Sequence, residues 1–125
     1  MALAPAIVIH GLAHARLALG PGRPVTLLSA PGAALYAGCG WWRAVVAASG
    51  AAGPDVLDCA DAAGRALEAL SAGCRWLVLL PCPAWEGVAE RAAAQGACLL
   101  RERPPALDLA EPGASRRIAA WLGFG

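Results

Sequence analysis

The sequence predicts an α/β domain of three layers, a mostly parallel sheet of four to five strands with helices on both faces. Short apolar runs, several of them rich in β-branched residues, recur along the whole chain. Each run is followed by turn residues and then by a stretch with helical spacing of its apolar positions. The chain has 125 residues, the size of one ordinary domain, so residues 1–125 are expected to form a single unit.

The order of elements follows from these runs, taken from the N-terminal end. AIVI is a first strand, and in the helix after it Leu12, Ala15 and Leu19 share one face before Gly20 ends it. PVTLL is a second strand, and SAPG is the turn into a helix that is apolar on nearly every side. Such a helix is buried or lies at an interface. The remaining predicted strands are residues 55–58, 75–80 and 97–100, with 106–110 a short edge strand or an extended loop, and the remaining helices begin near 61, 84 and 114.

Two features refine this prediction. RWLVLL, residues 75–80, is the clearest strand, because the five residues after Arg75 are all bulky and apolar, as expected of a parallel strand with both faces covered. Asp61 is expected to cap the helix that follows the third strand. Strands alternating with helices in this way favour right-handed crossovers and a parallel sheet that is Rossmann-like or flavodoxin-like in the broad sense.

A resemblance supports the same fold. The stretch PVTLLSAPGAALYAGCGWWRAVV, with HGLAHARLAL before it, resembles a family of short bacterial α/β proteins without an assigned activity. The resemblance covers most of the chain. It implies a fold and carries over no catalytic residue.

Composition narrows the class of protein. The chain is 58% hydrophobic and 15% charged, whereas charged residues make up about 25% of an ordinary soluble chain. A small domain cannot bury so much apolar surface alone, so we expect a homo-oligomer. The formal net charge is +1 and no basic stripe is present, which argues against a nucleic-acid partner.

The uncharged stretch from residue 24 to residue 42 is long enough to span a membrane, but Pro31-Gly32 inside it favours a turn, so no membrane partner is expected. The apolar start of the chain lacks the basic region of a signal peptide. The five cysteines are unpaired in spacing, which indicates a reducing, cytoplasmic location. They are Cys39, Cys59, Cys74, Cys82 and Cys98.

Candidate ligand-binding residues follow from the predicted fold, because ligands bind outside the carboxyl ends of parallel strands. Those ends are expected to carry Ser29, Gly32, Asp58, Cys82 and Arg101. The turn SAPG could hold an anion on exposed amides, although the Gly-x-Gly-x-x-Gly and Walker fingerprints are absent. The thiol before Pro83 would sit at a helix start, which favours a thiolate, but no base is predictably near it.

The two histidines and the aromatic residues are two further sets of candidate site residues. His10 and His14 are four residues apart, a spacing that suits a metal on one helix, yet no carboxylate or cysteine lies near them in sequence, so neither a metal nor a cofactor is expected. The apolar helix carries aromatic side chains that favour a subunit interface, with the C-terminal WLGFG as a second docking segment. The interface candidates are Tyr36, Trp41, Trp42 and Trp121.

The favoured function is a self-associating, non-catalytic binding or interaction domain, because no complete catalytic constellation is present. The alternative is an enzyme, or a phosphate- or nucleotide-binding protein, that uses the carboxyl-end cleft with Cys82 or Ser29 as its reactive group. A small anionic ligand fits either hypothesis. Whether the chain is an enzyme is left open at this point.

Overall fold

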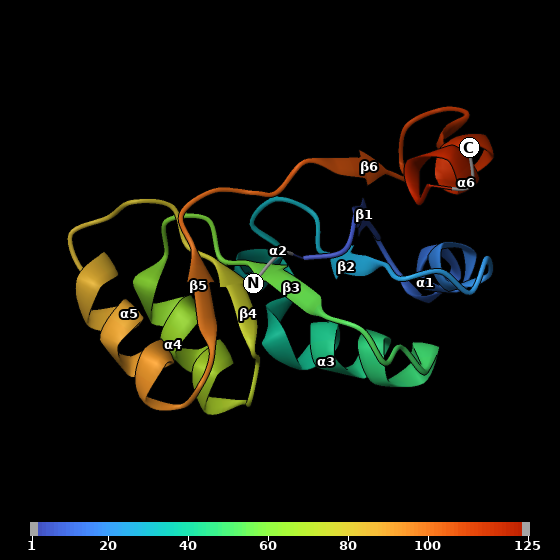
Figure 1. Cartoon of the computed structure of the whole chain (residues 1–125). Helices are drawn as coiled ribbons and strands as arrows, with labels where there is room; N and C mark the ends of the chain where they lie inside the picture. Colours follow the sequence, from blue (N-terminus) through green and yellow to red (C-terminus); the bar gives the residue numbers. More distant parts are fainter. Residues whose placement is uncertain (1–2, 124–125) are drawn as a thin grey trace.

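The computed structural model describes residues 3–123 and contains one sheet of six parallel strands (Figure 1). In spatial order the strands are β5, β4, β3, β2, β1 and β6. Their bounds are β1 Ala6–Val8, β2 Thr26–Leu28, β3 Asp55–Asp58, β4 Trp76–Val78, β5 Cys98–Leu100 and β6 Ala106–Asp108. The parallel α/β class is confirmed, and the sheet has six strands instead of four to five.

Helices connect the strands in the predicted alternation. They are α1 Leu12–Leu19, α2 Ala33–Tyr36, α3 Gly38–Ser49, α4 Ala63–Ser71, α5 Trp85–Ala94 and α6 Ile118–Trp121, with a 3-10 turn, η1, at Ala114–Arg117. Residues 106–110 were predicted as either an edge strand or an extended loop. The strand is observed, since β6 pairs with β1 over three residues. The apolar runs therefore located every strand of the sheet.

The first five strands lie side by side in chain order, and this arrangement decides where the helices go. Right-handed crossovers that always step the same way place their helices on the same face of a sheet. In agreement, α1 contacts α3, α3 contacts α4, and α4 contacts α5. The buried helix residues Ala18, Trp42, Leu70 and Val88 all join one cluster on this face.

The other face of the sheet is covered by extended chain. Its buried cluster consists of strand residues: Ala6, Val8, Leu28, Val56 and Val78. The side chains packed against this cluster are Leu3, Trp76, Leu100 and Ala106, none of which lies in a helix. The third layer thus consists of the segment before β1 and the connection from β5 to β6, which passes over the sheet to reach its far edge (Figure 1). The three-layer arrangement is confirmed, and on this face the side chains packed against the cluster come from extended chain, because the connection to β6 contains no helix.

Two local differences from the prediction concern the long apolar helix and the cap of α4. The apolar helix predicted from 33 to 48 breaks at Ala37, because Gly38 adopts a left-handed conformation (φ +86°) that no helix continues through. Asp61 does not cap α4, which begins after Ala62 without a side-chain cap. Instead, Asp58 Oδ1 accepts the backbone N–H of Ala60 at 2.7 Å, and this bond holds Ala60 at its unusual φ of +50°.

Among residues 3–123, no helix has the length and apolar character needed to cross a membrane. The uncharged stretch from residue 24 to residue 42 instead forms β2, a turn, α2 and the start of α3.

Candidate functional site

The structure brings Ser29 and Asp58 together at the carboxyl ends of β2 and β3, but it buries both. The Ser29 hydroxyl accepts the backbone N–H of Asp58 at 2.9 Å and donates to the carbonyl of Ala30 at 3.1 Å. Ser29 is 0% exposed and Asp58 is 3% exposed. Ser29 therefore joins two strand ends, and its hydroxyl is not available to attack a substrate.

Asp58 is paired with Arg103, which the sequence places with Arg101 after the carboxyl end of the fifth strand. Arg103 Nη1 lies 2.7 Å from Asp58 Oδ2 and donates as well to the carbonyl oxygen of Ser29 at 3.0 Å. Arg103 belongs to the connection between β5 and β6. The pair is largely shielded from water, so it fastens this connection to the ends of β2 and β3. No ligand is needed to satisfy either charge.

Cys82 and Arg101 form a separate pair of neighbours around Trp85. The backbone N–H of Trp85 donates to the Cys82 carbonyl at 3.0 Å, and the Arg101 guanidinium stacks 3.8 Å from the centre of the Trp85 ring. Arg101 also makes an exposed ion pair with Glu86. The Cys82 side chain is half-buried and packs on the helix-side core, and no histidine or carboxylate is bonded to it among the described residues. The arrangement is that of a packed thiol.

Gly32 is the N-cap of α2 and needs its glycine for backbone reasons, since its φ is +67°. A side chain there would approach the Cβ of Ala60 at 3.8 Å. The SAPG turn therefore leads into a helix of four residues rather than a long helix with a strong dipole.

Of the four aromatic interface candidates, one is fully buried and three are partly or largely exposed. Trp42 is 0% exposed, and its indole N–H donates to Asp55 Oδ1 at 3.1 Å, so it belongs to the core of the chain and not to a subunit contact. Trp121 donates to the carbonyl of Ala6 at 2.7 Å and thus docks on β1 of its own chain. Tyr36 remains 70% exposed and Trp41 36% exposed. These two lie on α2 and at the start of α3.

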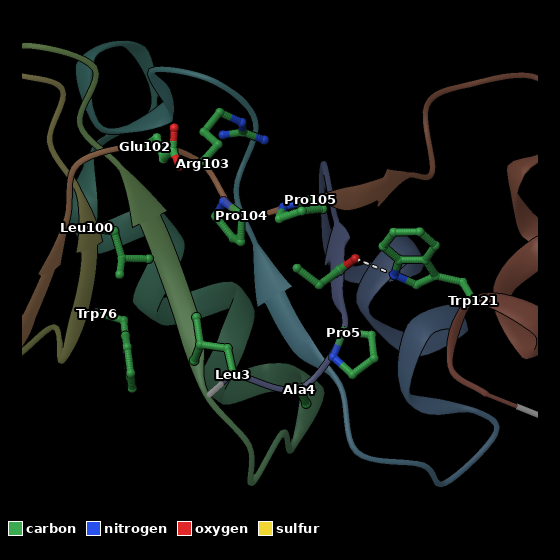
Figure 2. Close-up of a pocket in the computed structure, with 11 residues that line it drawn as sticks. Leu3, Ala4, Pro5, Trp76, Leu100, Glu102, Arg103, Pro104, Pro105 and Trp121 are labelled. Atoms are coloured by element: carbon green, nitrogen blue, oxygen red, sulfur yellow. Dashed lines mark hydrogen bonds between the residues drawn. The ribbon is translucent and has the colours of Figure 1, made fainter. Parts of the chain in front are cut away.

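A groove crosses the sheet face that the helices leave uncovered. Figure 2 shows the segment Leu3–Ala4–Pro5 on one side of it and Pro104 and Pro105 on the other, with Trp76 and Trp121 at its two ends. Its volume is about 500 Å³, which falls in the range of about 300–1,000 Å³ that small-molecule sites occupy. The groove exists because extended chain covers this face less completely than helices would.

The chemistry of the groove is apolar with one polar end. Leu3, Leu100 and the two prolines supply aliphatic walls, and the indoles supply flat apolar ends. The charged side chains on its lining are those of Glu102 and Arg103, which lie at the edge near the β5–β6 connection (Figure 2). Arg103 is already paired with Asp58. The groove therefore suits a ligand that is mainly apolar.

A second, polar site lies at the carboxyl ends of β1 and β6. His10 Nε2 is 2.7 Å from Asp108 Oδ1, and the backbone N–H of His10 donates to His14 Nδ1 at 3.1 Å. The two imidazole rings meet edge to face, with centroids 5.5 Å apart. Both line a cavity of about 280 Å³ together with Gly11, Leu12 and Ala13. Both histidines of the chain thus meet at one place, beside a carboxylate 98 positions from His10.

The hydrogen bonds fix the proton positions of this cluster. A backbone N–H can only donate, so His14 Nδ1 is the unprotonated nitrogen and the neutral ring carries its proton on Nε2. Partial burial raises the pKa of Asp108. The hydrogen bond from the Ala110 N–H, the bond from His10 and the charge of Arg103 lower the pKa by more, so it lies below its ordinary value. The ionised carboxylate accepts the proton of His10 Nε2.

Asp108 was not among the predicted site residues, whereas Arg103 was expected with Arg101 after the carboxyl end of the fifth strand. Asp108 lay in a segment that could be strand or loop, and its neighbour β1 is distant in sequence. The available signal was weak: a strand over residues 106–108 at the edge beside β1 would place a carboxylate next to His10. Within residues 3–123, no group of three or more His, Cys, Asp or Glu side chains is placed so that it could hold a metal ion.

Comparisons with known proteins add no assignment. No family model matches the sequence, and no curated protein matches it. The functional argument therefore depends on the geometry of the chain itself.

Proposed function

We propose that the protein is a non-catalytic binding domain whose ligand site is the groove between Trp76 and Trp121. The observation that carries this proposal is the contrast between the two faces of the sheet. The helix-covered face is packed by large side chains such as Trp42 and Leu70. The opposite face keeps a hollow of about 500 Å³ with an indole at each end.

The occupant best matched to this hollow is a small, ring-bearing, mainly apolar molecule. Indoles present large flat surfaces that pack against other rings at low cost in side-chain entropy. Because Glu102 and Arg103 lie at one edge only, a polar substituent of the ligand would sit at that edge. Neither reactive group of the enzyme alternative lines this groove. The Ser29 hydroxyl is buried and hydrogen-bonded to the Asp58 N–H, and no base is hydrogen-bonded to Cys82 among the described residues.

Binding of the dye 1-anilinonaphthalene-8-sulfonate to the folded protein at neutral pH tests this site, because its fluorescence rises in an apolar pocket. We expect saturable binding that Trp76→Ala abolishes and Trp41→Ala leaves unchanged. Ala4→Phe, which fills the groove without removing an indole, should also abolish binding. Equal binding by the two groove variants and the wild type would overturn the proposal, and loss of binding in Trp41→Ala alone would move the site to α3.

A second proposal concerns self-association, and a different observation favours it. Leu35, Tyr36 and Trp41 are 45%, 70% and 36% exposed, and no charged residue lies between them in sequence. We propose that this α2–α3 surface is buried between two copies of the chain, since large apolar side chains exposed together mark contact surfaces.

Sedimentation velocity tests the assembly. The wild type is expected to form a dimer at micromolar concentration, and Tyr36→Glu should shift it to monomer. Leu17→Glu is the matched control, because Leu17 is 49% exposed on α1 and carries the same change of charge. A monomeric wild type, or a Tyr36→Glu variant that remains assembled, would contradict this proposal.

A further inference from the structure

The histidine cluster lies where an open parallel sheet offers a second binding site. β1 is the point at which the strand order turns back, since β2 lies on one side of it and β6 on the other. Ligands of open α/β sheets bind outside the carboxyl ends at such a point. The cavity of about 280 Å³ lined by His10 and His14 occupies that place, and it is distinct from the apolar groove.

Each imidazole has one ring nitrogen committed to the protein and one left over. His10 uses Nε2 for Asp108, and His14 uses Nδ1 for the backbone of His10. No residue within 3–123 is hydrogen-bonded to His10 Nδ1 or His14 Nε2. In the neutral state His10 therefore offers an acceptor at Nδ1, and His14 offers a donor at Nε2.

A donor and an acceptor on two rings that line the same cavity are complementary to a carboxylic acid, which has one O–H and one carbonyl oxygen. If the acid transfers its proton to His10 Nδ1, the same complex becomes a carboxylate held by two N–H donors. Asp108 stabilises the resulting imidazolium from its other nitrogen, at 2.7 Å. The charged groups facing His10 are then Asp108 from β6, His14 from α1, and Arg103, whose charge acts on Asp108.

We propose that His10 and His14 bind a small carboxylate and that binding takes up one proton at His10. The cavity of about 280 Å³ limits the ligand to a small molecule. Because the complex holds one more proton than the free protein and the free carboxylate together, the affinity should fall as pH rises. Asp108 is a positioning residue in this scheme, since it acts on the ligand only through His10.

Proton NMR can follow this directly, because the two histidines are the only ones in the chain and each gives one Hε1 signal. We expect sodium acetate at pH 6 to shift both signals with one saturation curve, and sodium chloride at equal ionic strength to shift neither. At pH 8 the acetate affinity should be at least tenfold weaker. At pH 8, calorimetry of acetate binding in buffers of different ionisation enthalpy should show uptake of close to one proton.

Two variants separate the proposal from a purely structural role. Asp108→Asn keeps an oxygen for the Ala110 N–H but no longer stabilises the imidazolium, so the acetate affinity should fall at pH 6. His14→Phe keeps ring volume and should remove the shift of the remaining histidine signal. The proposal is overturned if acetate and chloride act alike, if only one signal moves, if affinity is independent of pH, or if inorganic phosphate binds more tightly than acetate.

Discussion

Arg103 and Asp58 form an ion pair of 2.7 Å across 45 positions of sequence, and this pair fixes the third layer of the fold. The connection that carries Arg103 has to cross the helix-free face to bring β6 to the far side of β1. It contains no helix to pack on that face. A charged anchor at the ends of β2 and β3 takes the place of such packing and holds one wall of the groove.

Arg103→Leu is predicted to destabilise the protein by about 3–5 kcal/mol, because the Asp58 carboxylate would remain buried without its partner. Urea unfolding monitored by circular dichroism measures this. Arg101→Leu is the control, since its pair with Glu86 is exposed on both sides and should cost less than about 1 kcal/mol. The double variant Asp58→Asn with Arg103→Leu should recover part of the loss. Equal stability of the two single arginine variants would contradict the anchoring role.

Local patterns were sufficient to predict the strands and most helices. Runs such as RWLVLL have one structural solution in a domain of this size, since a continuous apolar run must be covered on both faces. The pairing of β6 with β1 had no local signal, because it joins Ala6 to Ala106. The helix-free face, the groove and the His10–Asp108 contact all follow from that pairing, and so none of them could be derived from neighbouring residues.

The site residues show the same division. The fold class correctly placed Ser29 and Asp58 at adjacent strand ends. It could not show that Arg103 would arrive from the β5–β6 connection and occupy Asp58. Likewise, Trp41 and Trp42 are adjacent on an apolar helix, and only the path of α3 over the sheet decides which of them is buried.

Trp42→Ala is predicted to cost about 3–5 kcal/mol of unfolding free energy, because it removes a fully buried indole and its bond to Asp55. Trp41→Ala should change stability by less than about 1 kcal/mol, since Trp41 is partly exposed. The test is thermal and urea unfolding of both variants, at a concentration where the assembly state is known. If Trp41→Ala were the less stable of the two variants, the assignment of Trp42 to the core would be contradicted.

The cysteines should label in an order set by burial and pKa. Burial, with smaller effects from Asp58, Cys74 and Cys39, raises the pKa of Cys59 to about 12, so it remains a thiol at neutral pH. Burial also raises the pKa of Cys74. Cys98 is exposed on β5 and should react first with iodoacetamide, whereas Cys59 and Cys74 should react only after unfolding. Peptide mass spectrometry over time resolves each site. Labelling of Cys82 ahead of Cys98 would revive Cys82 as a reactive group.

Asp55 should make the protein less stable as pH rises. Burial raises its pKa above 3.8, and the bond from Trp42 and the charge of Arg43 only partly offset this. The folded state then holds more protons than the unfolded state between pH 3.8 and the folded pKa, so stability falls across that window. Asp55→Asn cannot ionise but still accepts the Trp42 N–H. Its stability relative to the wild type should therefore increase as pH rises from 3 to 7 in urea unfolding, and a constant difference would contradict the raised pKa.

Asp108 should act with the opposite sign, because its pKa lies below 3.8. Its bonds to His10 and Ala110 contribute stability that is fully present above pH 3.8 and is lost as pH falls through the lowered pKa. Asp108→Asn should therefore be less stable than the wild type at pH 5, and the difference should shrink toward pH 2. The same urea series as for Asp55→Asn provides the measurement. Both variants replace an aspartate by asparagine. If their stability relative to the wild type followed the same pH trend, the opposite pKa shifts of Asp55 and Asp108 would be contradicted.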